Sequence, residues 1–159
     1  MTTRQSAPQV RRAGPADVDG IVALIDANVS SGELLPRTPD FVAAQLEHFL
    51  VAGPPGAIIG CVHLDEYAPS LAEVRSLAVA PSAQGMGVGV ALVEGLERLA
   101  RTRGYATVFA VSNSGEFFRR RGYEERHIPE LDRERSSVSR YKGVHAKDLP
   151  AQPPAPSRG

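Results

Sequence analysis

A glycine-rich stretch between an apolar run and an amphipathic segment constrains the fold of this chain more than any other feature. Residues 77–91 read Leu-Ala-Val-Ala-Pro-Ser-Ala-Gln-Gly-Met-Gly-Val-Gly-Val-Ala. The run before Pro81 predicts a β-strand, and the glycines at 85–89 open a helix that Gly104 ends. One stripe of this helix is apolar and carries Val88, Leu92, Leu96 and Leu99. A strand that turns directly into a helix predicts an α/β fold, in which helices cover a sheet.

The hydrophobic pattern of the remaining chain predicts a mixed sheet. Apolar and β-branched runs bounded by turn residues predict strands at 9–12, 49–52, 57–64, 73–80, 105–111, from Tyr123, and at about 141–149. Helix-start residues followed by apolar residues at helical spacing predict further helices at 15–29, 38–46 and 115–121. Short turns join the earlier strands into hairpins, whereas a helical crossover precedes the later ones. We therefore expect a mixed sheet with helices on its faces.

Length and composition predict one soluble domain. The chain has 159 residues with 18 Lys plus Arg and 18 Asp plus Glu, so no net charge attracts nucleic acid. A single cysteine excludes internal disulfides, and no apolar run has the length of a membrane helix or a secretory leader. We expect a cytoplasmic protein with a core domain at 9–149 and flexible tails at 1–8 and 150–159. Nucleic acid, membrane and metal are not expected partners.

The turn at 84–89 has the chemistry of an anion site. The first N–H groups of a helix have no partner within the helix, the helix dipole adds positive charge there, and glycines let a phosphate approach the backbone. The sequence thus predicts a ligand that carries a diphosphate. A Walker loop would end in Gly-Lys-Ser/Thr, where this chain has Val90 and Ala91, and a dinucleotide site needs its third glycine one residue after Gly89. Both of these ligand classes are excluded.

Two motifs in order resemble one enzyme family. Gln84-Gly-Met-Gly-Val-Gly89 matches the Gln/Arg-x-x-Gly-x-Gly/Ala motif of the GNAT acetyltransferases, and Phe117-Phe-Arg-Arg-Arg-Gly-Tyr123 resembles the second coenzyme A segment of that family. The resemblance implies an N-acetyltransferase that uses acetyl-CoA as cosubstrate and no metal. It also implies an α/β (α+β) fold with a mixed, mostly antiparallel sheet of about six or seven strands, flanked by about four helices and splayed at the coenzyme site.

The same resemblance implies a set of coenzyme contacts. The backbone groups of Leu77 and Val79 are expected to pair with the pantetheine arm, as a further strand would. The pyrophosphate is expected on the backbone N–H groups of Gln84, Gly85, Met86, Gly87, Val88 and Gly89, and the thioester end against Phe117 and Phe118. The alternative, in which the glycines merely start a helix, remains open.

Acetyl transfer to an amine requires a base, because free amino groups are mostly protonated at pH 7. Glu73 is the candidate, since it lies on the strand that leads to the turn, where several GNAT enzymes carry a glutamate base. It would act directly or through a water. Strict alternation predicts that Glu73 shares a face with Arg75 and Leu77. The alternative is a strand glutamate whose only role is to pair with Arg75.

The leaving thiolate has no evident acid. Many GNAT enzymes carry a tyrosine where this chain has Phe118, and a phenyl ring donates no proton. Either water and backbone dipoles assist the thiolate, or Ser112 or Tyr123 supplies the proton. The resemblance implies direct attack of the amine on the thioester in a ternary complex, with N–H groups near Val79 stabilising the oxyanion. Cys61 is expected to lie in the core and not to act as a nucleophile.

Several segments are similar to the acetyltransferase domain of bacterial N-acetylglutamate synthase. They are 34–38, 60–64 and 73–79, and near the end Arg140 occurs where that family has Arg-x-Ser before its last strand, although Lys142 replaces the serine. The resemblance implies that the acceptor is the amino group of a free amino acid, glutamate before others, as in arginine biosynthesis. No amino-acid kinase-like segment precedes the domain, so we expect the short form.

The chemistry of an acidic amino acid points to arginines as its ligands. Planar guanidinium groups bind carboxylates in a bidentate manner, so Arg37, Arg75 and Arg140 are the expected substrate-binding residues. Two other functions remain open. One is acetylation of another amine, such as a protein N-terminus, a polyamine or an antibiotic, and the other is a regulatory module that binds coenzyme A without turnover. A homodimer is a further expectation.

Overall fold

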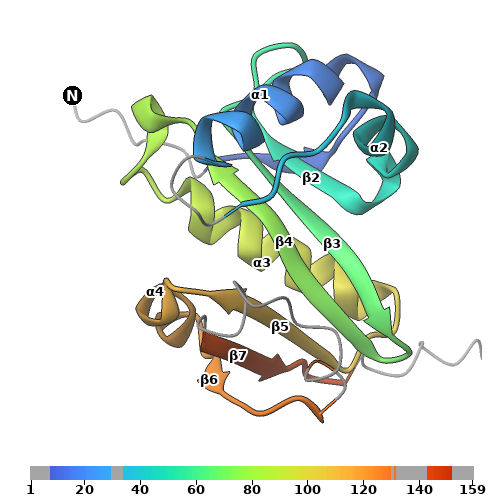
Figure 1. The fold of residues 1–159 in the computed structure, drawn as a ribbon, viewed down its shortest axis with the longest axis vertical. Helices are drawn as coiled ribbons and strands as arrows, with labels where there is room; N and C mark the ends of the chain where they lie inside the picture. Colours follow the sequence, from blue (N-terminus) through green and yellow to red (C-terminus); the bar gives the residue numbers. More distant parts are fainter. Residues whose placement is uncertain (1–7, 30–33, 130, 132–142, 152–159) are drawn as a thin grey trace, which may run out of the picture.

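The computed structural model describes residues 8–29, 34–129, 131 and 143–151, which build a seven-stranded sheet with helices on both faces (Figure 1). The strands are β1 Val10–Arg12, β2 Phe49–Ala52, β3 Gly60–Ala68, β4 Leu71–Val79, β5 Thr107–Ser112, β6 Glu124–Glu125 and β7 Gly143–Asp148. The helices are α1 Val18–Val29, α2 Pro39–Ala44, α3 Val88–Thr102 and α4 Gly115–Arg120. The spatial order is β1-β2-β3-β4-β5-β7-β6, and among these described strands only β4 and β5 are parallel neighbours. The predicted fold class is confirmed.

Two apolar clusters lie on opposite faces of the sheet. Leu92 and Leu96 of α3 belong to one cluster, and Ile21 of α1 belongs to the other. Phe49 and Leu50 are adjacent in β2 and join different clusters, as the alternation of side chains along a strand requires. The helices before β2 therefore cover one face of the sheet, and the long helix after β4 covers the other.

The β3 strand begins and ends later than its apolar pattern indicates. A strand was expected at 57–64, whereas β3 spans Gly60–Ala68. Ile58 and Ile59 precede the strand and contact different apolar clusters from the connecting segment, so they are apolar without belonging to the ladder. Asp65 and Glu66 extend the strand because their backbone pairs with β4. A strand end that faces solvent on one side carries no apolar signal, which is why the sequence pattern ended too early.

The sheet divides between β4 and β5. These strands pair only through Leu71–Glu73 and Thr107–Phe109, although β4 continues to Val79 and β5 to Ser112. In Figure 1 the two strands separate toward the end that carries α4. Within the described residues, the β4 edge that faces β5 therefore has no strand partner beyond Glu73. The splay expected for a GNAT fold is present.

An extra residue at Ser76 reverses the faces of β4. The register pairs His63 with Arg75 but Cys61 with Ala78, so three steps along β4 match two along β3, and Ser76 has a left-handed φ of 51°. This is a β-bulge. Its effect corrects the expectation that Glu73, Arg75 and Leu77 share a face. Glu73 and Arg75 do, but Leu77 contacts the cluster around α3 on the opposite face.

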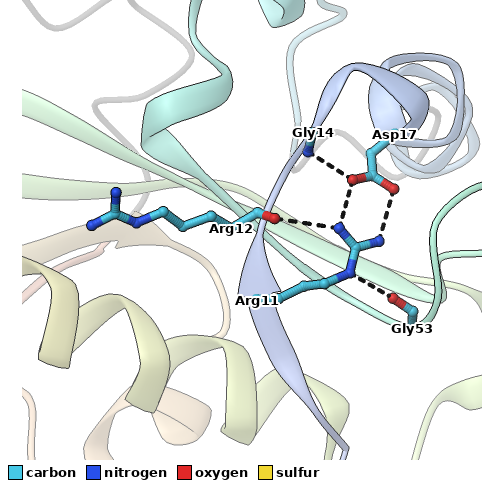
Figure 2. A network of polar contacts seen from close by, with 5 residues as sticks. All are labelled: Arg11, Arg12, Gly14, Asp17 and Gly53. Atoms are coloured by element: carbon cyan, nitrogen blue, oxygen red, sulfur yellow. Dashed lines mark hydrogen bonds and ion pairs between the residues drawn. The ribbon is translucent and has the colours of Figure 1, made fainter.

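An ion-pair network fastens the edge strand β1 to the body of the domain (Figure 2). Asp17 is 1% exposed and accepts two hydrogen bonds from the guanidinium of Arg11, at 2.8 and 2.9 Å, and one from the N–H of Gly14 at 2.8 Å. Arg11 also donates to the carbonyl oxygens of Gly53 and Arg12. The Arg11 guanidinium holds the pKa of Asp17 below its usual value. These hydrogen bonds connect β1, a three-residue strand at the edge of the sheet, to the turn at 14–17 and to Gly53.

Two further predictions concern the limits of the domain and the absence of a membrane helix. The domain limits at 9–149 stay a prediction, because most of the tails lie outside the described residues. Within the described part of the chain, no helix combines the length and the apolar character needed to cross a bilayer.

Candidate active site

The turn between β4 and α3 has the backbone of an anion site. Gly85 and Gly87 both have φ of 81°, in the left-handed region that favours glycine. A Cβ added at either position would meet no atom within 4 Å, so the conformation and not the space requires glycine there. The first turn of α3 contains no acidic residue that would oppose a bound anion.

Most of the predicted phosphate-binding N–H groups are unpaired. The N–H groups of Gln84 and Met86 donate to carbonyl oxygens within the turn at 3.4 Å. The N–H groups of Gly85, Gly87, Val88 and Gly89 have no backbone acceptor among the described residues, and Ala91 is the first to donate into the helix. Four donors therefore remain available to a ligand at the start of a helix of 15 residues.

The unpaired edge of β4 leads directly to this turn. The N–H of Ala80 donates to Ile59, on the β3 side, so alternation turns the N–H and carbonyl of Val79 to the opposite side. The carbonyl oxygen of Val79 accepts a hydrogen bond from the side-chain Nε2 of Gln84 at 3.5 Å. The backbone N–H and carbonyl of Leu77, two residues earlier, point to the same side as those of Val79. The backbone groups expected to pair with a pantetheine arm thus face the side on which β5 has moved away.

Three elements meet beside the helix start. A Cβ on Gly89 would lie 3.6 Å from the ring of Phe117 and 3.9 Å from Val79, so α4, α3 and the end of β4 are in contact there. Phe118 points elsewhere: it is 4% exposed and packs edge-to-face against Tyr123 in the core. Phe117 is therefore positioned beside the predicted coenzyme path, while Phe118 supports it from within the core.

The candidate base lies where the sheet divides. Glu73 is the last residue of β4 that pairs with β5, opposite Phe109, and on its other side it pairs with Asp65 of β3. Burial raises the pKa of Glu73 to about 7, the negative charge of Asp65 adds to this, and Arg75 and Arg37 act against it. A carboxyl group with such a pKa is half ionised at neutral pH, which suits a general base.

Arg75 pairs with a residue that sequence reasoning did not select. Its Nη1 lies 3.2 Å from Oδ2 of Asp65, and both side chains are about one-third exposed, at 34% and 33%. The expected alternative was a pair between Arg75 and Glu73. The described residues contain no ion pair to Glu73, so the structure does not favour that alternative.

Arg37 reaches the same site from the segment before α2. Its guanidinium carbon lies 5.0 Å from the ring centre of Phe41, and its Nε is buried without a hydrogen-bond partner among the described residues. Burial and the nearby positive charge of Arg75 lower the pKa of Arg37, whereas Asp65 and Glu73 raise it. A buried donor without an acceptor at a cationic centre is suited to an anionic group of a ligand.

A buried, uncharged histidine lies close to these charged side chains. His63 is 2% exposed, stacks on Phe49 at 4.5 Å and meets Phe41 edge-on at 5.8 Å. Its Nε2 lies 3.4 Å from the side-chain oxygen of Gln45, and its Nδ1 is buried without a partner in the described part of the chain. Burial lowers the pKa of His63 to about 4, so the ring is uncharged at neutral pH.

Sequence reasoning missed Asp65 and His63. The signal that reveals them is the hairpin register, because residues paired across β3 and β4 face the same side. A strand predicted to end at Leu64 leaves Asp65 outside the sheet, and so hides its position opposite Glu73.

Of the two alternative proton donors, Tyr123 donates its proton in a hydrogen bond to another residue, whereas Ser112 only accepts a hydrogen bond among the described residues. Tyr123 donates to Oε2 of Glu97 at 2.9 Å, and Lys147 donates to Oε1 of the same carboxylate at 2.9 Å. Burial raises the pKa of Tyr123, and the charge of Glu97 raises it further, which makes Tyr123 a poor acid. The hydroxyl oxygen of Ser112 accepts a hydrogen bond from the N–H of Ser114 at 2.9 Å.

Arg140, Lys142 and Cys61 are the remaining residues for which the sequence predicts a role or a location. Arg140 and Lys142 lie outside the described residues. Cys61 is fully buried, and burial raises the pKa of its thiol to about 12, so it is a core residue as expected. The described part of the chain contains no group of three side chains arranged to hold a metal ion.

Comparison with known proteins agrees with this geometry. Residues 24–123 match the model of the acetyltransferase (GNAT) family. The amino-acid acetyltransferase of Pseudomonas fluorescens is 34% identical over 135 residues, which cover 84% of this chain and 31% of that protein. The chain thus spans about a third of the length of this relative.

Solved structures share the fold. N-acetylglutamate synthase from Neisseria gonorrhoeae, complexed with coenzyme A and N-acetyl-glutamate, superposes with a TM-score of 0.80 at 28% identity over 92% of this chain and 36% of that one. Rv2747 from Mycobacterium tuberculosis, in complex with CoA and a second ligand, gives a TM-score of 0.78 at 28% identity, over 89% of this chain and 99% of that one. The splayed sheet, the glycine turn and these matches confirm the predicted N-acetyltransferase, and the chain belongs to the acetyltransferase (GNAT) family.

Proposed function

We propose that this protein transfers the acetyl group of acetyl-CoA to the amino group of a free amino acid, with glutamate as the preferred acceptor. The proposal rests on Arg37 and Arg75, which lie within electrostatic range of Glu73. Two guanidinium groups beside a base form a site for a molecule that carries both a carboxylate and an amine. A polyamine carries no anion for these arginines to bind.

Acetyl-CoA enters this proposal through the glycine turn. The N–H groups of Gly85, Gly87, Val88 and Gly89, which have no backbone acceptor among the described residues, are placed to hold its pyrophosphate. The β4 edge at Leu77 and Val79, which has no strand partner among the described residues, is placed to pair with its pantetheine arm. The thioester would then lie near Phe117 and the divided part of the sheet. Solved relatives with this fold bind coenzyme A, which supports the same ligand here.

The reaction follows from the position of Glu73. The carboxylate removes one proton from the acceptor ammonium, directly or through a water, and the neutral nitrogen attacks the thioester carbon. Backbone N–H groups near Val79 stabilise the oxyanion, the carbon–sulfur bond breaks, and the thiolate leaves. As the thiolate leaves, the nitrogen gives up its second proton to solvent and becomes the amide nitrogen, and the thiolate takes a proton from solvent. Phe118 has no proton to donate, and Tyr123 is a poor acid.

The choice of glutamate draws on the relatives. The Pseudomonas fluorescens relative is named an amino-acid acetyltransferase, and the Neisseria gonorrhoeae structure contains N-acetyl-glutamate. Arg140 is proposed as a third carboxylate ligand, and a place in arginine biosynthesis is proposed on the same basis. A cytoplasmic location and a homodimer stay predictions.

A thiol-release assay tests the acceptor. Acetyl-CoA is supplied with each amino acid in turn, with spermidine, and with a peptide that has a free N-terminus, and the acetylated product is identified by mass spectrometry. We expect glutamate to give the highest kcat/KM, and the amide glutamine a lower one. Equal or higher kcat/KM with spermidine or the peptide would end the amino-acid assignment.

A further inference from the structure

Asp65 and Glu73 are alternative ion-pair partners for the guanidinium of Arg75. The β3–β4 register sets Asp65 opposite Glu73, and His63 opposite Arg75, on one face of the hairpin. Arg75 thus has a carboxylate two residues before it on its own strand and another diagonally across the ladder. Its Nη1 contacts Oδ2 of Asp65 at 3.2 Å, and the described residues provide no hydrogen-bond donor to the Glu73 carboxylate.

Whether Arg75 pairs with Asp65 or with Glu73 determines how well Glu73 can act as a base. An arginine in direct contact with a carboxylate favours the ionised form and lowers its proton affinity by about one to three pKa units. If Arg75 paired with Glu73, Glu73 would hold its negative charge firmly and would accept a proton poorly at neutral pH. In the structure Arg75 pairs with Asp65, and Glu73 keeps a high proton affinity.

This inference depends on the role of Glu73 in the proposed function. We propose that Asp65 is a positioning residue for acetyl transfer: by holding Arg75 across the hairpin, it prevents an ion pair between Arg75 and Glu73 and leaves the Glu73 carboxylate free to accept the proton of the acceptor amine.

The other groups around Glu73 do not replace Asp65. His63 on β3 is neutral at neutral pH, because burial lowers its pKa to about 4. Arg37, from the segment before α2, lies over Phe41 at 5.0 Å and has no ion pair among the described residues. On the β5 side the register partner of Glu73 is Phe109, which is apolar and buried. Asp65 is the acidic group within this set that contacts Arg75.

The charge-removing substitution Asp65→Asn tests the proposal directly. It frees Arg75, which then turns to Glu73. The pKa of Glu73 is measured by carbon-13 NMR of the labelled glutamate carboxyl groups in the unliganded protein, with Glu73→Gln identifying the signal. We expect a fall of about one unit or more in Asp65→Asn. Glu66→Gln is the matched control, since Glu66 is the next residue of the same strand, is exposed, and loses the same charge.

A second substitution separates the role of Arg75 from the charge of Asp65 itself. If Asp65 acts by holding Arg75, then Arg75→Leu raises the pKa of Glu73 more in the Asp65→Asn background than in the wild type. If Asp65 acted only through its own negative charge, Arg75→Leu would raise the pKa of Glu73 equally in the wild type and in the Asp65→Asn background. Equal increases, an unchanged pKa in Asp65→Asn, or an equal fall in Glu66→Gln would each overturn the proposal.

Kinetics give the functional readout. In Asp65→Asn we expect the acidic limb of the kcat/KM profile to move to lower pH together with the NMR titration, and kcat at pH 8 to fall about fivefold or more, because a weaker base accepts the proton less readily. The NMR titration does not require turnover, so it tests Asp65 even if no amine proves to be an acceptor. An unchanged kcat alongside a lowered pKa would show that Glu73 is not the base, and would remove Asp65 from the reaction.

Discussion

The guanidinium carbon of Arg37 lies 5.0 Å from the ring centre of Phe41, and no described residue provides an acceptor for the buried Nε of Arg37. The cation lies over the ring and has an Nε donor without an acceptor among the described residues, so it is suited to bind an anion. Arg37→Ala is therefore expected to raise KM for glutamate about tenfold or more, in proportion to the loss of a charged hydrogen bond. Thiol release over a range of glutamate concentrations measures this. KM for acetyl-CoA should not change, and a parallel rise in both KM values would contradict a role in acceptor binding.

Glu73→Gln removes the candidate base and keeps the shape of the side chain. We expect kcat to fall about 100-fold or more, because the acceptor ammonium then loses its proton only to solvent. In the wild type, kcat/KM should fall as pH drops through about 7, since burial raises the pKa of Glu73 to about 7 and the base must be ionised. The acidic limb should disappear in Glu73→Gln. Persistence of the same limb would assign it to another group.

Gly87→Ala and Gly104→Ala form a matched pair at the two ends of α3. Both glycines have positive φ, 81° and 88°, and a Cβ at either position meets nothing within 4 Å. Each substitution should cost about 1–2 kcal/mol of stability through backbone strain alone. Isothermal titration should find weaker binding of coenzyme A only in Gly87→Ala, because Gly104 is remote from the anion turn. Equal affinities would argue against the turn as the phosphate site.

Tyr123→Phe distinguishes a structural tyrosine from a catalytic one. The hydroxyl of Tyr123 donates to Glu97 at 2.9 Å, and burial with the charge of Glu97 raises its pKa. We expect the loss of this hydrogen bond to lower the free energy of unfolding by about 1–2 kcal/mol and to leave kcat within about twofold. Chemical denaturation and thiol release measure the two quantities. A large fall in kcat with little loss of stability would make Tyr123 the acid.

Arg11→Ala leaves the buried Asp17 carboxylate without its charged partner, although the N–H of Gly14 still donates a hydrogen bond to it. We expect a loss of about 3 kcal/mol in the free energy of unfolding at pH 7. The Arg11 guanidinium lowers the pKa of Asp17 in the folded state, so this stabilisation is complete above the unfolded value near 3.8 and is lost as pH falls through the lower folded value. Arg12→Ala, which removes the same charge from the next residue, is the control and should cost under about 0.5 kcal/mol. Urea unfolding from pH 3 to 7 makes the comparison.

The sheet and the coenzyme turn were predictable because they depend on local patterns. The apolar run before Pro81 and the glycines at 85–89 are contiguous, so a strand, a turn and a helix follow from their order. The stripe of α3 was predicted for the same reason, and its residues Leu92 and Leu96 are fully buried.

The acceptor side was less predictable because it depends on register. One additional residue at Ser76 reverses the faces of β4, and no local pattern marks it, since Ser76 is a common residue with an uncommon φ of 51°. The pairing of Arg75 with Asp65 requires knowing which residues of two strands lie opposite each other. Sequence reasoning identified Glu73, Arg75 and Arg37, but the partner of Arg75 follows only from the three-dimensional ladder.

The bulge at Ser76 also restricts how this domain can be recombined with its relatives. A hybrid joined before Ser76, with a partner strand that lacks the additional residue, would turn every later side chain of β4 to the other surface. Val79 would leave the surface that packs against α3, and Ala78 would take its place there. Fragment exchange should therefore carry the whole hairpin Gly60–Val79 as one block.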